Sequence, residues 1–186
     1  MNTILSFNIN IGDLNDVKVQ RIQEILKPDF QGAVSMPNQL VLTGNAEQII
    51  LTPVQVQYSC THEYFDRIQS NIIKIQELFM LDQVINRMTV LFADTQDLKV
   101  DVMKYSKEKF GSLISDSLGI GKREFFQYNG SLSEIKVEPL LNDNKNLYIQ
   151  GLYNLSLCPI SEINNVLNEI KVDYNRKKEE IFKNLQ

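Results

Sequence analysis

The sequence is poor in cysteine, in positive charge and in long apolar runs. Its 186 residues include two cysteines, no tryptophan, and 19 Lys and Arg against 23 Asp and Glu. Two cysteines cannot form a disulfide scaffold or a four-cysteine zinc site. A net charge of -4 argues against a dedicated nucleic-acid binder, because such proteins neutralise phosphates with Lys and Arg. We therefore expect that the protein binds no nucleic acid and holds no metal or other cofactor.

Membrane and export signals are also missing. No apolar run approaches the ~18 residues of a membrane helix, and Met1-Asn2-Thr3-Ile4 lacks the basic and apolar segments of a signal peptide. We expect a cytoplasmic protein with reduced thiols and no membrane partner. The hydrophobic fraction of 43% and charged fraction of 23% suit one globular domain over residues 1–186.

In the first part of the chain, the apolar periodicity predicts strands and helices in alternation. Apolar residues alternate over 5–11, which predicts a strand, and recur at helical spacing over 14–26 after a cap at Asp13 or Asp16. We expect a loop at 28–39, strands at 40–42 and 48–60, and a helix from Thr61 to Phe79. Pro53 indicates an edge position or a bulge in the longer strand.

The second part predicts a similar series of elements. We expect a strand at 85–93, then a helix ending near Gly119 that carries Phe110, Leu113, Ile114 and Leu118. Asn129-Gly130 predicts a hairpin between strands at 125–128 and 132–137. A turn at 142–144, a strand at 147–157 and a final helix capped by Ser161 complete the chain.

These elements predict an α+β fold, an antiparallel sheet with helices packed on one face. Residues 1–82 and 83–186 form two similar halves in this interpretation, and each contains a long strand ending in a cysteine, Cys60 or Cys158, before a helix. A duplicated β-α-β-β-α unit explains the similarity. Chance explains it equally simply, since such arrangements are common.

Candidate catalytic groups are few. Cys60 and His62 lie at a strand–helix junction, where a thiol and a base could form a nucleophilic pair. Their spacing does not require the side chains to meet. Gly119-Ile120-Gly121-Lys122 has only part of a phosphate loop, which favours a helix end and a turn. The acidic residues fall in turn-rich or solvated stretches and indicate no site: Asp94, Asp97, Glu134, Glu138 and Asp143. We therefore nominate no catalytic residue and no metal ligand.

Uncharged polar residues occupy the outer faces of the expected strands. Such a face costs less to desolvate than a charged one, which favours contact with a partner. A codon preference for Asn would give a similar composition. The nominated partner-binding residues are Asn8, Asn10, Gln55, Gln57, Gln150 and Asn154.

From about residue 38 onward, the layout resembles a sporadically distributed group of uncharacterised bacterial proteins related to the SecB-type export chaperone. The resemblance rests on Tyr58 with Phe65, on Asn86-Arg87-Met88-Thr89-Val90, and on Ile181-Phe182 near the end of the last helix. Val90-Leu91-Phe92 stands where the group has a glycine-rich strand. The resemblance implies a helix-covered antiparallel sheet, no catalytic residues, and a chaperone-like or oligomeric role.

The leading hypothesis is a non-enzymatic protein that binds a protein partner or a second copy of itself. One alternative is an accessory protein of a mobile element or defence system. Another is a small-molecule binder or cysteine-dependent enzyme that uses Cys60 or His62.

Overall fold

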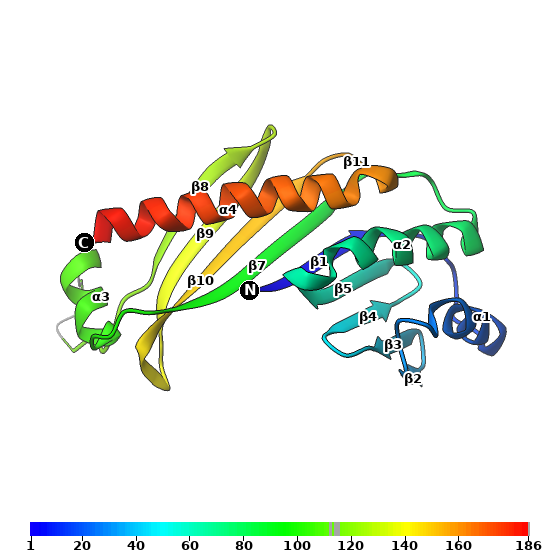
Figure 1. Ribbon diagram of the computed structural model, residues 1–186, viewed down its shortest axis with the longest axis horizontal. Coiled ribbons are helices and arrows are strands. Elements are labelled where there is room, and N and C mark those ends of the chain that lie inside the picture. The colour runs from blue at the N-terminus through cyan, green and yellow to red at the C-terminus, as the bar shows by residue number, and fades with distance from the viewer. Residues whose placement is uncertain (112, 114–115, 186) are drawn as a thin grey trace. The chain divides into compact units, whose positions relative to one another are not determined.

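The structure is a computed structural model that describes residues 1–111, 113 and 116–185 (Figure 1). Over these residues the chain has an α+β fold with four α-helices and extensive antiparallel β-sheet. This confirms the predicted fold class. The chain divides into two compact units. The first unit comprises residues 2–90 and 154–169, and the second comprises Met1 with residues 91–153 and 170–186.

The first unit has five main strands in the order β2-β3-β4-β5-β1, with antiparallel neighbours. The strands are β1 (Asn2–Asn8), β2 (Gly32–Met36), β3 (Gln39–Thr43), β4 (Glu47–Leu51) and β5 (Gln55–Thr61). Helix α1 (Asp16–Leu26) follows β1, and the 3-10 turn η1 (His62–Tyr64) leads from β5 into α2 (Phe65–Phe79). Two short strands, β6 (Val84–Ile85) and β11 (Cys158–Pro159), pair separately.

The second unit orders its strands β7-β10-β9-β8. The elements along the rest of the chain are β7 (Met88–Asp97), α3 (Val102–Phe110), β8 (Lys122–Tyr128), β9 (Ser131–Leu140), β10 (Asp143–Leu155), η2 (Ile160–Glu162) and α4 (Ile163–Leu185). Of these, η2 and residues 163–169 of α4 belong to the first unit. The order β8-β9-β10-β7 matches β3-β4-β5-β1 in the first unit. Cys60 and Cys158 both lie two residues before a 3-10 turn and five before a helix. A duplicated unit would produce this correspondence, and duplication remains a prediction.

Alternate strand residues build the core of the first unit. In the pairing of β1 with β5, Leu5 lies opposite Tyr58 and Phe7 opposite Val56, and all four side chains are buried. Helix α2 contributes Ile68, Ile72 and Ile75, which are also buried and recur at helical spacing. The opposite strand residues consequently form a separate face of the sheet.

Aromatic packing builds the core of the second unit. The ring of Phe92 on β7 lies 5.4 Å from that of Tyr174 on α4, and Tyr174 donates a hydrogen bond of 3.3 Å to the carbonyl of Ile149. Gly151 on β10 allows this close approach, since a Cβ there would lie 2.6 Å from the Tyr174 ring. Helix α4 thus covers one face of these strands.

Two predictions about the first unit were wrong. The expected loop at 28–39 contains β2 and the start of β3, because Pro37 and Asn38 form a two-residue hairpin turn in which Asn38 has φ 59. The expected strand at 48–60 is two strands, with Pro53 in the turn between β4 and β5. Pro53 therefore marks a turn, and β5 lies between β4 and β1 rather than at an edge.

The expected helix ending near Gly119 was also wrong. Helix α3 begins after Asp101, whose carboxylate accepts from the backbone N–H groups of Met103 and Lys104, and its C-cap is Gly111 at φ 75. Leu113 and Leu118 are exposed, and Ile114 lies outside the described residues.

The predicted helix caps differ as well. Asn15 caps α1 in place of Asp13 or Asp16. Thr61 makes no side-chain cap bond, and Ser161 lies in η2, because a 3-10 turn precedes both α2 and α4. The hairpin at Asn129-Gly130 is confirmed, with φ values of 47 and 77 that fit a type I′ turn.

Candidate functional site: an uncharged sheet face

One face of the first unit's sheet carries no charged residue. We call it the open face: it consists of the side chains opposite in alternation to the buried core residues. Its members are Asn2, Ile4, Ser6 and Asn8 of β1; Gly32, Val34 and Met36 of β2; Gln39, Val41 and Thr43 of β3; Gln48 and Ile50 of β4; and Gln55, Gln57, Ser59 and Thr61 of β5. Every one of these residues is exposed or half-buried.

Strand register sets the neighbours on the open face. Residues directly opposite one another in an antiparallel pair point to the same side of the sheet. The registers therefore form a row across the strands, Val34–Val41–Ile50–Gln57–Ser6, with apolar side chains at one end and polar ones at the other. Val34, at the apolar end of this row, was not expected on a strand, because residues 28–39 were interpreted as a loop.

Three of the six nominated partner-binding residues lie together on the open face. Asn8 lies directly opposite Gln55, and Gln57 lies opposite Ser6 in the same pair of strands. Asn8 and Gln55 are exposed, and Gln57 is half-buried. The amide-rich pattern therefore marks one continuous surface in this part of the molecule.

The other three nominated residues lie elsewhere. Asn10 is exposed but follows the end of β1, where it lines with Asn8 a cavity of about 620 Å³ near the end of α2. Gln150, in the second unit, accepts a hydrogen bond of 3.2 Å from Tyr148. Asn154 accepts one of 3.3 Å from Thr89.

The corresponding sheet face of the second unit is charged. Gln150 lies opposite Lys136, and Lys136 pairs with Glu138 at 3.0 Å. On the neighbouring strands, Arg123 pairs with Glu134 at 3.3 Å. A codon preference would act on both units alike, so it does not explain why only one face lacks charge.

A buried polar network lies on the core side of the first unit. The side chain of Glu47 is fully buried, and its carboxylate accepts hydrogen bonds from the Tyr58 hydroxyl and, at 2.9 Å, from Arg67. Asn71 donates to the Tyr58 hydroxyl at 3.1 Å and accepts from Lys74 at the same distance. Burial raises the pKa of Tyr58, and its bond to Glu47 raises the pKa further. The network joins β4, β5 and α2 and is structural in character.

The candidate nucleophile has an unfavourable environment. Cys60 is buried, and burial, followed by the charge of Glu47, raises the pKa of its thiol to about 12. Cys158 is also buried, with its pKa raised to about 11 by burial and then by Glu162. His62 is exposed in η1. A thiol with such a pKa is protonated near neutral pH and is a poor nucleophile.

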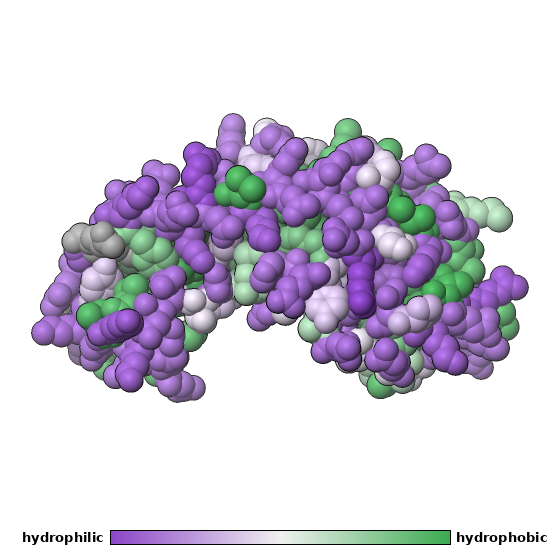
Figure 2. All heavy atoms as spheres, in the orientation of Figure 1, coloured by the Kyte–Doolittle hydropathy of each residue, from purple (hydrophilic) through white to green (hydrophobic). Residues whose placement is uncertain are grey.

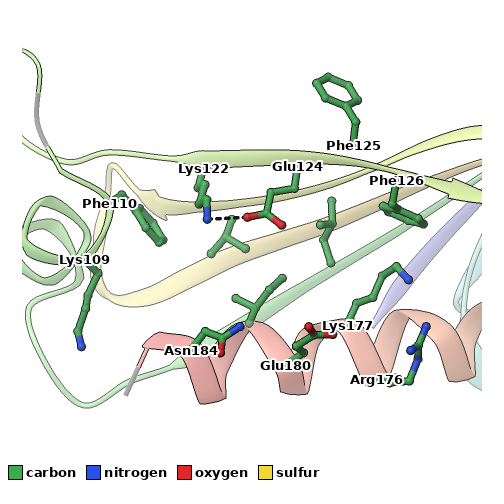
Figure 3. A pocket seen from close by; sticks show the side chains of 13 residues that line it. Lys109, Phe110, Lys122, Glu124, Phe125, Phe126, Arg176, Lys177, Glu180 and Asn184 are labelled. Atoms are coloured by element: carbon green, nitrogen blue, oxygen red, sulfur yellow. Dashed lines mark ion pairs between the residues drawn. The ribbon is translucent and has the colours of Figure 1, made fainter.

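A groove in the second unit lies between α4, α3 and β8 (Figure 3). Its cavity of about 290 Å³ has an apolar lining that includes Ile135 and Val137. Figure 3 shows Phe126 pointing towards α4 and Phe125, its neighbour on β8, pointing away from it. Lys177 lies 4.3 Å from the Phe126 ring centroid.

Charged groups rim the groove, and several of them form ion pairs. Lys122 pairs with Glu124, as the dashed line in Figure 3 marks. Arg176 and Lys177 both pair with Asp173, at 2.6 and 3.1 Å. The groove can therefore accept a small apolar group, and three of the cations on its rim already pair with carboxylates.

The remaining candidate motifs serve local structure. Gly119 lies where a Cβ would come within 2.6 Å of Met103, and the backbone N–H of Ile120 donates to Ser106, so the segment packs on α3 and does not form the helix end that we expected. Asp94 pairs with Lys178 at 2.7 Å. Among the described residues, no three His, Cys, Asp or Glu side chains are grouped so that they could hold a metal ion.

Figure 2 shows a mainly hydrophilic surface along α4. On this helix Arg176, Glu179 and Glu180 are exposed, whereas Lys177 and Lys178 are half-buried. Over the residues that the structure describes, no helix is long and apolar enough to cross a membrane.

Comparison with protein-family models finds no match, and comparison with curated protein sequences also finds none.

Proposed function

We propose that the chain is a non-enzymatic binding protein that docks another protein on the open face. The observation that carries this proposal is the lack of charge over five adjacent strands in a chain of which 23% of the residues are charged. Charged groups are depleted from the centres of protein interfaces. Covering the open face would desolvate amides, hydroxyls and aliphatic side chains but no ion, so its cost is low.

The state of the cysteines supports a non-enzymatic role. Cys60 is the nucleophile that the sequence offers beside a histidine, and its raised pKa keeps it protonated. A chaperone-like role, which the resemblance to SecB-related proteins implies, and self-association are two forms of the same proposal. The cytoplasmic location expected from the sequence remains part of it.

The groove supports a second candidate function, binding of a small apolar ligand. Its volume of about 290 Å³ and its buried Ile135 and Val137 support the binding of such a ligand. The paired charges on its rim make it the weaker candidate.

Site-specific photo-crosslinking tests docking on the open face. A photoreactive residue replaces Gln57 in the full chain, and the matched control replaces Gln127, an exposed amide on β8. We expect one defined protein adduct from position 57 in cells that express the chain, and little from position 127. The adduct should be lost in a Ser59→Lys background, because the added charge would have to be desolvated.

Equal adducts from both positions would contradict the proposal. An adduct that persists at full yield with Ser59→Lys would also contradict it. An adduct of the chain with itself would support the self-association form.

A further inference from the structure

Strand β2 is an exposed edge of the first unit's sheet. It stands at the end of the strand order and, among the described residues, pairs only with β3. All five of its residues are exposed, with Val34 at 57% and Met36 at 44%. An edge strand of this kind presents unpaired backbone groups to any strand that approaches it.

The edge lacks the charged side chains that usually protect an edge strand against pairing. Natural proteins place charged side chains, especially Lys, on edge strands to prevent strand addition. From Phe30 to Ala46 the sequence contains no Asp, Glu, Lys or Arg. Strand β8, at the edge of the second unit, provides the contrast, since it begins Lys122-Arg123-Glu124.

The hairpin turn determines which backbone groups face outwards. In a hairpin, the two residues that flank a two-residue turn are hydrogen-bonded to each other through their backbone N–H and C=O groups. Hydrogen-bonded and non-hydrogen-bonded residue pairs then alternate along the two strands. Met36 and Gln39 flank the turn, so the backbone groups of Met36, Val34 and Gly32 face β3. Those of Ala33 and Ser35 point away from β3, towards the free edge.

These outward groups are self-complementary. We propose that two copies of the chain join their sheets through β2, as an antiparallel pair with Val34 opposite Val34 of the second copy. In this register Ala33 of each copy faces Ser35 of the other, and the two pairs exchange four backbone hydrogen bonds. Val34 falls at the closely spaced position, where two exposed aliphatic side chains meet.

The ends of the strand limit the pairing. Pro37 has no N–H to donate, so the ladder cannot continue regularly past the turn. No charged residue of β2 meets another in this register. Because opposite residues share a side of the sheet, the open faces of the two copies would form one continuous uncharged surface.

The pairing rests on the edge of the sheet, whereas the proposed function rests on its face. A strand of five residues is a small interface, so we expect a dissociation constant in the micromolar range or weaker. Light scattering and sedimentation of the full chain, up to millimolar concentration, should show a reversible dimer.

Val34→Lys is the diagnostic variant. It places two ammonium groups opposite each other across the twofold axis and should weaken dimerisation at least about 100-fold. Val54→Lys is the matched control, because Val54 is 64% exposed and lies in the β4–β5 turn. It should leave dimerisation unchanged, and both variants should keep the circular dichroism spectrum of the parent chain.

Val34→Cys tests the register without depending on the lysine variant. Closely spaced antiparallel residues lie within the Cα separation that a disulfide needs. Mild oxidation should therefore give a disulfide-linked dimer from Val34→Cys, and much less from Val54→Cys. A strict monomer at every concentration, or a dimer that Val34→Lys does not weaken, would overturn the pairing. The photo-crosslinking result at position 57 would stand in either case.

Discussion

At the scale of single residues, burial determines the chemistry of the two cysteines. Cys60 and Cys158 have thiol pKa values raised to about 12 and about 11, in both cases mainly by burial. The reactive species is the thiolate, which is scarce at pH 8 under these conditions. We predict that neither cysteine reacts with a thiol-specific reagent at pH 8 in the folded protein, and that both react after denaturation. A native Cys60 that reacts at the rate of a free thiol would restore the enzymatic alternative.

Individual residues also show what sequence reasoning can and cannot predict. Asn8, Gln55 and Gln57 lie on one side of the sheet, because strand periodicity determines the side to which each side chain points. The same reasoning missed Glu47, which looks solvated in sequence but is a buried member of the network with Tyr58 and Arg67. Glu47 lies opposite the buried Cys60 in the pairing of β4 with β5. This position indicates burial only when residues 48–60 are recognised as parts of two strands.

At the scale of elements, the packing of α4 on β10 depends on a glycine. Gly151→Ala would place a Cβ 2.6 Å from the ring of buried Tyr174. We predict a loss of about 2 kcal/mol in the free energy of unfolding, as expected for overpacking in a core. Denaturant unfolding measures this change. Gly32→Ala on β2 is the control, since its Cβ would be 3.5 Å from its nearest neighbours, and its change should stay within about 0.5 kcal/mol. Equal effects of the two variants would show that Gly151 has no packing role.

Most elements could be predicted, and the two errors about strands in the first unit have a common cause. Long periodic segments such as α2, α4 and the β8–β9 hairpin carry strong patterns of apolar residues and turn residues. Pro37 and Pro53 were interpreted as a loop residue and a strand interruption, although both lie in hairpin turns. A proline in a short turn and one in a loop or bulge have the same local signature, and only strand pairing distinguishes them.

At the scale of the whole chain, charge is unevenly distributed between the two units. The net charge of -4 indicates nothing unusual, but the open face of the first unit has no charged residue, while the matching face of the second has the ion pairs Arg123–Glu134 and Lys136–Glu138. Composition could not reveal this contrast, because it depends on which residues share a face. The contrast is the basis both for docking on the open face and for pairing through β2.

Docking on the open face requires that this face is free of the chain's own segments and available to a partner. Thiol labelling of a Gln57→Cys variant at pH 8 tests this claim most directly, because the native cysteines are buried and give little background. We predict that the introduced thiol reacts in the isolated chain at a rate comparable with that of a Gln127→Cys variant. A Gln57→Cys thiol as unreactive as the buried native cysteines would contradict it, because the face would then be covered.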